Sequence, residues 1–315
     1  MRNILICLFT IFICKEIGAQ IVYPYPSQKF TFHVENKDSY LSYMDVKPSN
    51  DNGKTIILFH GKNFSGYYWK DVIPLLVNKG YRVIVPDQPG WGHSGKPNLH
   101  YSFHMLAAIN KSLLDSLHVN KLIVLGHSMG GMLAIRFSLM YPDLVEKLVL
   151  ENPIGLEDYK TFVPYQSLET LYKKEKAASY ESYKKYQQSY YPVWKPEYEQ
   201  YVTAQAEALS DPGFDSIARV NAITYQMIYE QPVVYELNHL AVPAVLLIIG
   251  QADRTVVGKE LLTDAQKQQY GQYPQLGRKT AAAIKNSKLV ELEGMGHIAH
   301  VQDLQLFAKA LFEFL

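Results

Sequence analysis

Residues 121–131 read Lys-Leu-Ile-Val-Leu-Gly-His-Ser-Met-Gly-Gly, and this stretch decides the fold. Leu122–Leu125 form a continuous apolar run, which is typical of a strand buried on both faces. A helical pattern follows over 130–140, so Ser128 stands at a sharp turn between a strand and a helix. In this context the Gly-x-Ser-x-Gly pattern predicts a serine nucleophile whose hydroxyl projects from the edge of a sheet.

The same kind of apolar run recurs along the chain. Further buried strands are expected at 55–59, 81–85, 147–150, 244–249 and 288–292. Two alternating segments precede them, with an edge strand at 29–34 and a second strand at 41–46. Helical patterns lie at 67–79, 103–117, 130–140 and 301–314. This alternation predicts an α/β fold with a mostly parallel central sheet and helices on both faces.

One segment, 153–240, breaks the alternation because it contains no comparable strand pattern and is helical, polar and rich in tyrosine. We interpret it as a helical cap, or lid, inserted into a core formed by 20–152 and 241–315. Its lysines are expected on a solvated helix face. The long stretch 255–279 is left open, since it fits a pocket loop as well as a surface loop.

The first nineteen residues differ from the rest. Arg2 precedes an apolar run over 4–14, and a small residue, Ala19, follows. This pattern predicts a signal peptide over 1–19, cleaved after Ala19, and a secreted or periplasmic protein. A membrane anchor is the alternative, but eleven helical residues rise only ~16 Å, about half of a bilayer core. A lipoprotein signal at Cys14 is a second alternative. Cleavage would remove both cysteines of the chain, so we expect no disulfide.

Charge and motifs exclude several functions. The chain has 31 basic and 30 acidic residues and a net charge of +1, so no basic field exists to bind nucleic acid. It has neither a phosphate loop nor a dinucleotide-binding fingerprint. We find no ligand cluster spaced for a metal, and expect no metal and no cofactor. The partner that we expect is a small-molecule substrate.

Five motifs together resemble the α/β-hydrolase superfamily over nearly the whole length that follows the signal. They are His60-Gly61-Lys62-Asn63-Phe64, Asp87-Gln88-Pro89-Gly90-Trp91-Gly92-His93-Ser94, Gly126 to Gly131, Gly250-Gln251-Ala252-Asp253 and Gly296-His297. The resemblance is to single-domain members that carry a helical cap. It implies the α/β-hydrolase fold and a Ser-His-Asp mechanism, and it says little about the substrate.

The resemblance also implies which residues act with Ser128. His297 follows the last strand, where the family places its general base, and His300 is the nearby competitor. Asp253 matches the acid that orients the base, although some members take the acid from the preceding strand, which offers Glu151 here. The chain order Ser128, Asp253, His297 is the order of this superfamily.

An oxyanion needs hydrogen-bond donors held in place before the reaction. By resemblance, these are the backbone N–H groups of Lys62 and Met129. The aromatic residues Phe64, Tyr67 and Trp69 come just after Lys62 and are predicted to form walls of the substrate pocket.

These residues predict an exported serine hydrolase that cleaves a small carboxylic ester, lactone or thioester through an acyl-enzyme on Ser128. A carbon–carbon bond hydrolase or an aminopeptidase of the same fold is an alternative, as is a binding protein without turnover. The cap is expected to control chain-length preference and not chemistry. The oligomeric state stays open.

Overall fold

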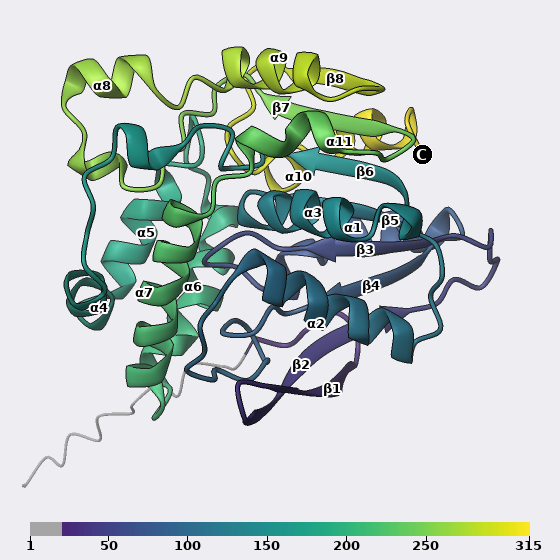
Figure 1. The fold of residues 1–315 in the computed structure, drawn as a ribbon, viewed down its shortest axis with the longest axis horizontal. Helices are drawn as coiled ribbons and strands as arrows, with labels where there is room; N and C mark the ends of the chain where they lie inside the picture. Colours follow the sequence, from purple (N-terminus) through teal and green to yellow (C-terminus); the bar gives the residue numbers. More distant parts are fainter. Residues whose placement is uncertain (1–20) are drawn as a thin grey trace, which may run out of the picture.

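The computed structural model describes residues 21–315, so the predicted signal peptide, 1–19, lies outside the described residues. A sheet of eight strands forms the centre, in the order β1-β2-β4-β3-β5-β6-β7-β8 (Figure 1). The strands are β1 (Ser27–Val34), β2 (Lys37–Val46), β3 (Thr55–Phe59), β4 (Arg82–Pro86), β5 (Leu122–His127), β6 (Val145–Glu151), β7 (Val245–Gly250) and β8 (Ser287–Leu292).

All eight predicted strands are present, and their ends differ from the prediction by four residues or fewer. From β3 to β8 every pairing is parallel, whereas β1 pairs with β2 and β2 with β4 in antiparallel fashion. The prediction of a mostly parallel sheet with β1 at its edge is therefore confirmed.

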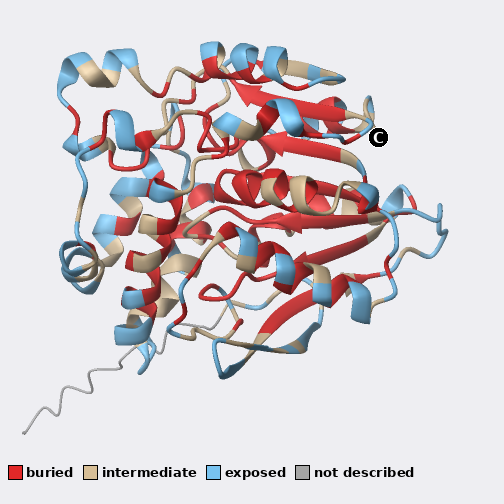
Figure 2. Ribbon diagram, in the orientation of Figure 1, coloured by how far each residue is buried: buried red, intermediate tan, exposed pale blue. Residues whose placement is uncertain are grey.

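Helices cover both faces of the sheet, and the central strands are buried (Figure 2). Their buried side chains are mostly apolar. Successive residues of a strand point to opposite faces. Ile57 and Phe59 accordingly pack in one core cluster with α2 and α3, while Ile56 and Leu58 pack in the other with α1 and α11. The core helices are α1 (Val72–Asn78), α2 (Phe103–Ser116), α3 (Met129–Met140), α8 (Asp264–Gln269), α9 (Tyr273–Ala283), α10 (Ala299–Gln302) and α11 (Leu304–Phe312).

The cap lies between β6 and β7, where the structure has helices and no strand. Its α-helices are α4 (Leu168–Lys176), α5 (Tyr180–Gln188), α6 (Glu199–Ala206) and α7 (Phe214–Glu230). They stand at the left of Figure 1, beyond the carboxyl ends of the parallel strands. This is the edge at which open α/β sheets bind ligands.

Three predicted segments differ from the structure. The helix expected over 67–79 is a 3-10 turn, Gly66–Trp69, followed by α1. The helix expected over 301–314 is interrupted at Asp303, whose extended backbone ends α10 and whose side chain accepts the N–H of Leu306 to begin α11. The open segment 255–279 contains α8 and the start of α9.

Glycines allow the nucleophile turn to form because backbone segments meet there almost in contact. A Cβ atom on Gly130 would lie 2.1 Å from the Phe59 main-chain oxygen, and one on Gly126 would lie 2.2 Å from the Gly130 oxygen. Both distances are far below van der Waals contact, and the obstructing atoms are backbone. The turn therefore requires glycine at both positions.

We expect Gly130→Ala to lower the free energy of unfolding by about 2–3 kcal/mol, because β3 and α3 must be pushed apart. Urea unfolding followed by circular dichroism measures the change. Gly213→Ala is the control, since its Cβ would meet only the Asp211 side chain at 3.1 Å, and it should cost less than about 1 kcal/mol. Equal losses in the two variants would contradict this account of the turn.

Candidate active site

Ser128 sits in a strained backbone conformation between β5 and α3. Its φ is 57° and its ψ is −120°, a combination that a residue with a side chain rarely adopts. Backbone hydrogen bonds hold Ser128 in this conformation. Its N–H donates to the Glu151 main-chain oxygen at 3.2 Å. Its main-chain oxygen accepts the N–H of Gly131 at 2.9 Å and the N–H of Ile154 at 3.2 Å. The strained conformation is therefore fixed by its neighbours on both sides.

The base predicted from the sequence lies within reach of this serine. His297 Nε2 is 2.9 Å from Ser128 Oγ, and its Nδ1 is 2.7 Å from Asp253 Oδ2. A carboxylate accepts hydrogen bonds only, so Nδ1 carries the proton and Nε2 presents its lone pair to the serine hydroxyl. The imidazole is thus oriented to remove the proton from Ser128.

Asp253 is buried and accepts hydrogen bonds on both oxygens. The Asn152 side-chain amide donates to Oδ2 at 2.6 Å, and the Thr255 N–H donates to Oδ1 at 2.8 Å. Burial by itself raises the pKa of Asp253, but His297 and these two donors bring the pKa below its ordinary value. The carboxylate is therefore held ionised beside the imidazole, where it can stabilise the imidazolium.

The alternative base, His300, and the alternative acid, Glu151, bind each other. His300 Nδ1 lies 2.8 Å from Glu151 Oε2, and the His300 N–H donates to Oε1 at 2.9 Å. Both side chains are buried. This pair fixes the start of α10, just after the loop that carries His297, and the Ser128 hydroxyl bonds to His297 and not to either of these side chains. The structure thus brings Ser128, His297 and Asp253 together.

The predicted oxyanion donors are available. Neither the Lys62 N–H nor the Met129 N–H donates to another backbone group among residues 21–315. A Cβ atom on Gly61 would lie 3.1 Å from the Ser128 Cβ, which places the loop before Lys62 directly against the nucleophile. His60 anchors this loop, because its Nε2 accepts the Gln88 N–H at 2.9 Å and its Nδ1 lies 2.9 Å from the Gly61 oxygen.

A buried hydrogen-bond chain that sequence reasoning missed connects the oxyanion loop to the base. His127 Nε2 lies 2.9 Å from the main-chain oxygen of His297, so this nitrogen must carry the proton. Burial lowers the pKa of His127 well below its ordinary value, so the ring is neutral. Its Nδ1 therefore accepts a hydrogen bond from the Tyr68 hydroxyl at 3.1 Å. The Tyr68 oxygen in turn accepts the Gly61 N–H at 2.8 Å. The only feature of the sequence that could have predicted this hydrogen-bond chain is the position of His127 next to Ser128.

The Lys62 side chain joins the oxyanion loop to the cap. Its ammonium lies 3.8 Å from the Glu175 carboxylate of α4, and the two side chains are only 13% and 19% exposed. Burial lowers the pKa of Lys62, and the negative charge of Glu175 partly offsets this. The loop that supplies one oxyanion donor is therefore in contact with the cap.

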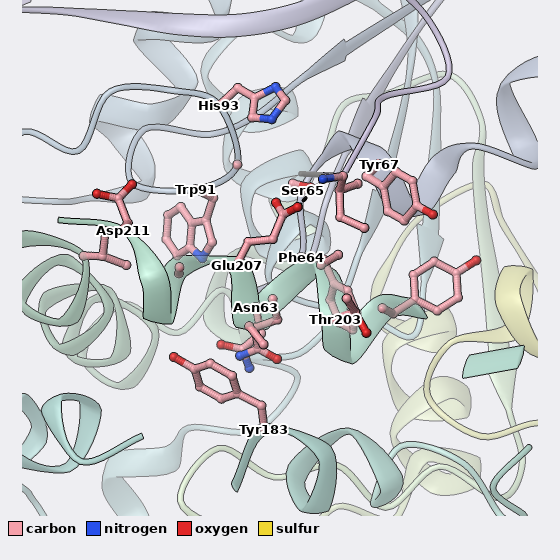
Figure 3. Close-up of a pocket in the computed structure, with 18 of the residues that line it drawn as sticks. Asn63, Phe64, Ser65, Tyr67, Trp91, His93, Tyr183, Thr203, Glu207 and Asp211 are labelled. Carbon is pink, nitrogen blue, oxygen red and sulfur yellow. Dashed lines mark hydrogen bonds between the residues drawn. The ribbon is translucent and has the colours of Figure 1, made fainter. Parts of the chain in front are cut away.

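A cavity of about 920 Å³ lies between the cap and the core, and Figure 3 shows residues of both around it. The lining includes Asn63, the residue after Lys62, with Phe64 and Tyr67, but none of Ser128, Asp253 and His297. The lining does not contain Trp69. That residue is fully buried and stacks on His300 with the ring centroids 4.2 Å apart. The prediction of Trp69 as a pocket wall is therefore wrong, because its ring packs in the core against His300, the partner of Glu151.

Residues 21–315 contain no group of three or more His, Cys, Asp or Glu side chains arranged to bind a metal. None of their helices combines the length and apolar character that crossing a bilayer requires.

Asp253→Asn should lower kcat for ester hydrolysis by ~10⁴-fold, because an amide favours the wrong imidazole tautomer. Glu151→Gln should lower kcat by less than about tenfold and act mainly on stability, since it removes a buried partner of His300. Steady-state kinetics and thermal unfolding of both variants separate the two roles. The assignment of Asp253 fails if Glu151→Gln causes the larger loss of kcat.

Curated relatives match part of the chain. A 2-hydroxy-6-oxononadienedioate/2-hydroxy-6-oxononatrienedioate hydrolase from Pseudomonas putida is 38% identical over 125 residues, which are 38% of this chain and 44% of that protein. The hydrolase of that name from Escherichia coli strain K12 is 41% identical over 108 residues, 32% of this chain and 38% of that protein. The chain thus matches less than half the length of these relatives.

Solved structures and a family model match much more of the chain. A probable hydrolytic enzyme from Pseudomonas aeruginosa PAO1 superimposes with a TM-score of 0.91 and 43% identity, over 93% of this chain and 95% of that one. An enol-lactonase from Burkholderia xenovorans LB400 has a TM-score of 0.67 and 21% identity, over 90% and 99%, and shares the fold. The model of the α/β hydrolase fold matches residues 54–304. The chain therefore belongs to the α/β-hydrolase fold family.

Proposed function

We propose that this protein is a serine hydrolase that cleaves a small carboxylic ester, lactone or thioester through an acyl-enzyme on Ser128. The observation that carries the proposal is the distance of 2.9 Å between Ser128 Oγ and His297 Nε2, with Asp253 bonded to the other ring nitrogen. A serine hydroxyl is a weak nucleophile unless a neighbouring base removes its proton, and this arrangement supplies that base.

The reaction would run in two halves. In the first, His297 takes the Ser128 proton while Oγ attacks the carbonyl carbon, and the backbone N–H groups of Lys62 and Met129 bind the oxyanion. Collapse of the tetrahedral intermediate expels the alcohol or thiol, which receives the proton from His297 and leaves an ester on Ser128. In the second half, His297 takes a proton from water, the resulting hydroxide attacks the ester, and the acid leaves as Ser128 regains its proton.

The names of the curated relatives favour one alternative, cleavage of a carbon–carbon bond in a dicarboxylate. A substrate that reaches Ser128 through the cavity beside Asn63 and Phe64 would pass charges that disfavour a dianion. Two carboxylates line this cavity, those of Glu207 and Asp211, against one lysine, Lys96. The Lys96 ammonium already donates to the main-chain oxygens of Gly92 and Ser94, both at 2.7 Å. A neutral ester meets less repulsion in this cavity than a dianion.

We expect purified protein to turn over p-nitrophenyl butyrate, and Ser128→Ala to lower kcat by at least ~10³-fold, because the nucleophile is lost. Release of nitrophenolate at 405 nm measures this directly. A 2-hydroxy-6-oxo-dienedioate is the comparison substrate, followed through the loss of its dienolate absorbance. A kcat/KM for the dienedioate that exceeds the ester value would establish the alternative instead.

We also propose that the protein is exported, on the basis of the amino-terminal pattern in 1–19. Expression of the full chain with a carboxyl-terminal tag should yield a product that begins at Gln20, as read by amino-terminal mass spectrometry. Replacing Ile4–Leu8 by a charged stretch should leave the chain uncleaved and in the cytoplasmic fraction. A product of the unaltered gene that keeps residues 1–19 would refute cleavage after Ala19.

A further inference from the structure

One residue of the cap binds the catalytic base directly. Tyr190 follows α5, and its main-chain oxygen accepts the His297 N–H at 2.7 Å. The cap is joined to the base loop here by a hydrogen bond between backbones that lie 107 positions apart in sequence. Movement of the Tyr190 backbone would therefore move the backbone of His297.

The Tyr190 ring makes a second contact with the same residue. Its plane lies at 26° to the His297 imidazole, with the ring centroids 4.9 Å apart. The ring also packs near Phe64, in the oxyanion loop, at 6.1 Å between centroids. Tyr190 is only 6% exposed, so it is fixed between the base and the oxyanion loop. One face of the imidazole is thereby closed to water and to rotation.

The base loop is shaped to receive this cap residue. A Cβ atom on Gly296 would lie 2.2 Å from the Tyr190 main-chain oxygen and 2.8 Å from Pro192 Cδ. Any residue larger than glycine at position 296 would therefore push the cap backbone away from His297. This close approach is independent of the ring contact and points to the same partner.

We propose that Tyr190 is a positioning residue for the base: its main-chain oxygen and its ring hold His297 in the orientation that reaches both Ser128 and Asp253. Because this inference concerns the base, it rests on the proposed serine hydrolase function. It gives the cap a part in chemistry, whereas the sequence suggested control of chain length alone. An imidazole displaced by about 1 Å can lose roughly a hundredfold in rate, so support from one face has a measurable effect.

The test compares three variants with the wild type. Tyr190→Phe keeps the ring, Tyr190→Leu removes it, and Tyr191→Leu is the matched control, because Tyr191 is equally buried at 6% exposed but stacks on Tyr198. We expect Tyr190→Leu to lower kcat by roughly 10- to 100-fold with KM within about threefold. Tyr190→Phe and Tyr191→Leu should stay within about threefold of the wild type in both parameters.

A second readout does not depend on turnover. The proton shared by His297 and Asp253 should give a far-downfield resonance in the proton NMR spectrum of the wild type, and we expect Tyr190→Leu to shift or broaden it while Tyr191→Leu leaves it unchanged. If wild-type protein shows this resonance but hydrolyses no ester, the proposed function fails and the resonance still tests Tyr190. If Tyr190→Leu does not fold, Tyr190→Met takes its place, since it fills similar volume without a ring.

Three results would overturn the proposal. The first is an unchanged kcat and resonance in Tyr190→Leu. The second is an equal loss in Tyr191→Leu, which would mean that any damage to the cap acts the same way. The third is a loss confined to KM, which would make Tyr190 a substrate contact and not a support for the base.

Discussion

Ser128 has a positive φ at a turn where the backbone leaves no room for a Cβ atom on Gly126 or Gly130, and where one on Gly61 would lie 3.1 Å from the Ser128 Cβ. Gly126, Gly130 and Gly61 are the points of contact, and each belongs to a different part of the turn or of the loop beside it. The close packing has a chemical consequence. It brings the loop before Lys62 against Ser128, and Met129 follows Ser128 directly, so the two proposed oxyanion donors lie on segments that the glycines bring together.

Around this turn the buried polar groups form hydrogen-bond chains that leave little freedom. One chain runs from Gly61 through Tyr68 and His127 to the main-chain oxygen of His297. A separate pair, Glu151 and His300, fixes the helix start that follows the base. In a medium of low polarity each such bond is strong and each broken one is expensive, so the base and the oxyanion loop are held as a unit.

Features of the fold and site could be predicted from the sequence where residues near one another in the chain determine them. The buried strands were found because runs such as Leu122–Leu125 are apolar on both faces. Ser128, Asp253 and His297, which the structure brings together, were singled out because they follow strand ends in recognisable motifs. The helical segment is interrupted at Asp303 because the side chain of this one residue caps α11, and hydrophobic periodicity gives no sign of such a cap. Trp69 was misplaced because its environment depends on the His300–Glu151 pair, two residues brought together only by folding. The contact of Tyr190 with His297 is equally non-local.

We infer that the close-packed turn makes Ser128 the nucleophile and His297 its base. The most direct test of this inference is to treat the protein with a fluorophosphonate and locate the adduct by peptide mass spectrometry. We expect one adduct, on the peptide that contains Ser128, and almost none in His297→Ala under the same conditions. An adduct on a different residue, or undiminished labelling of Ser128 in His297→Ala, would contradict it.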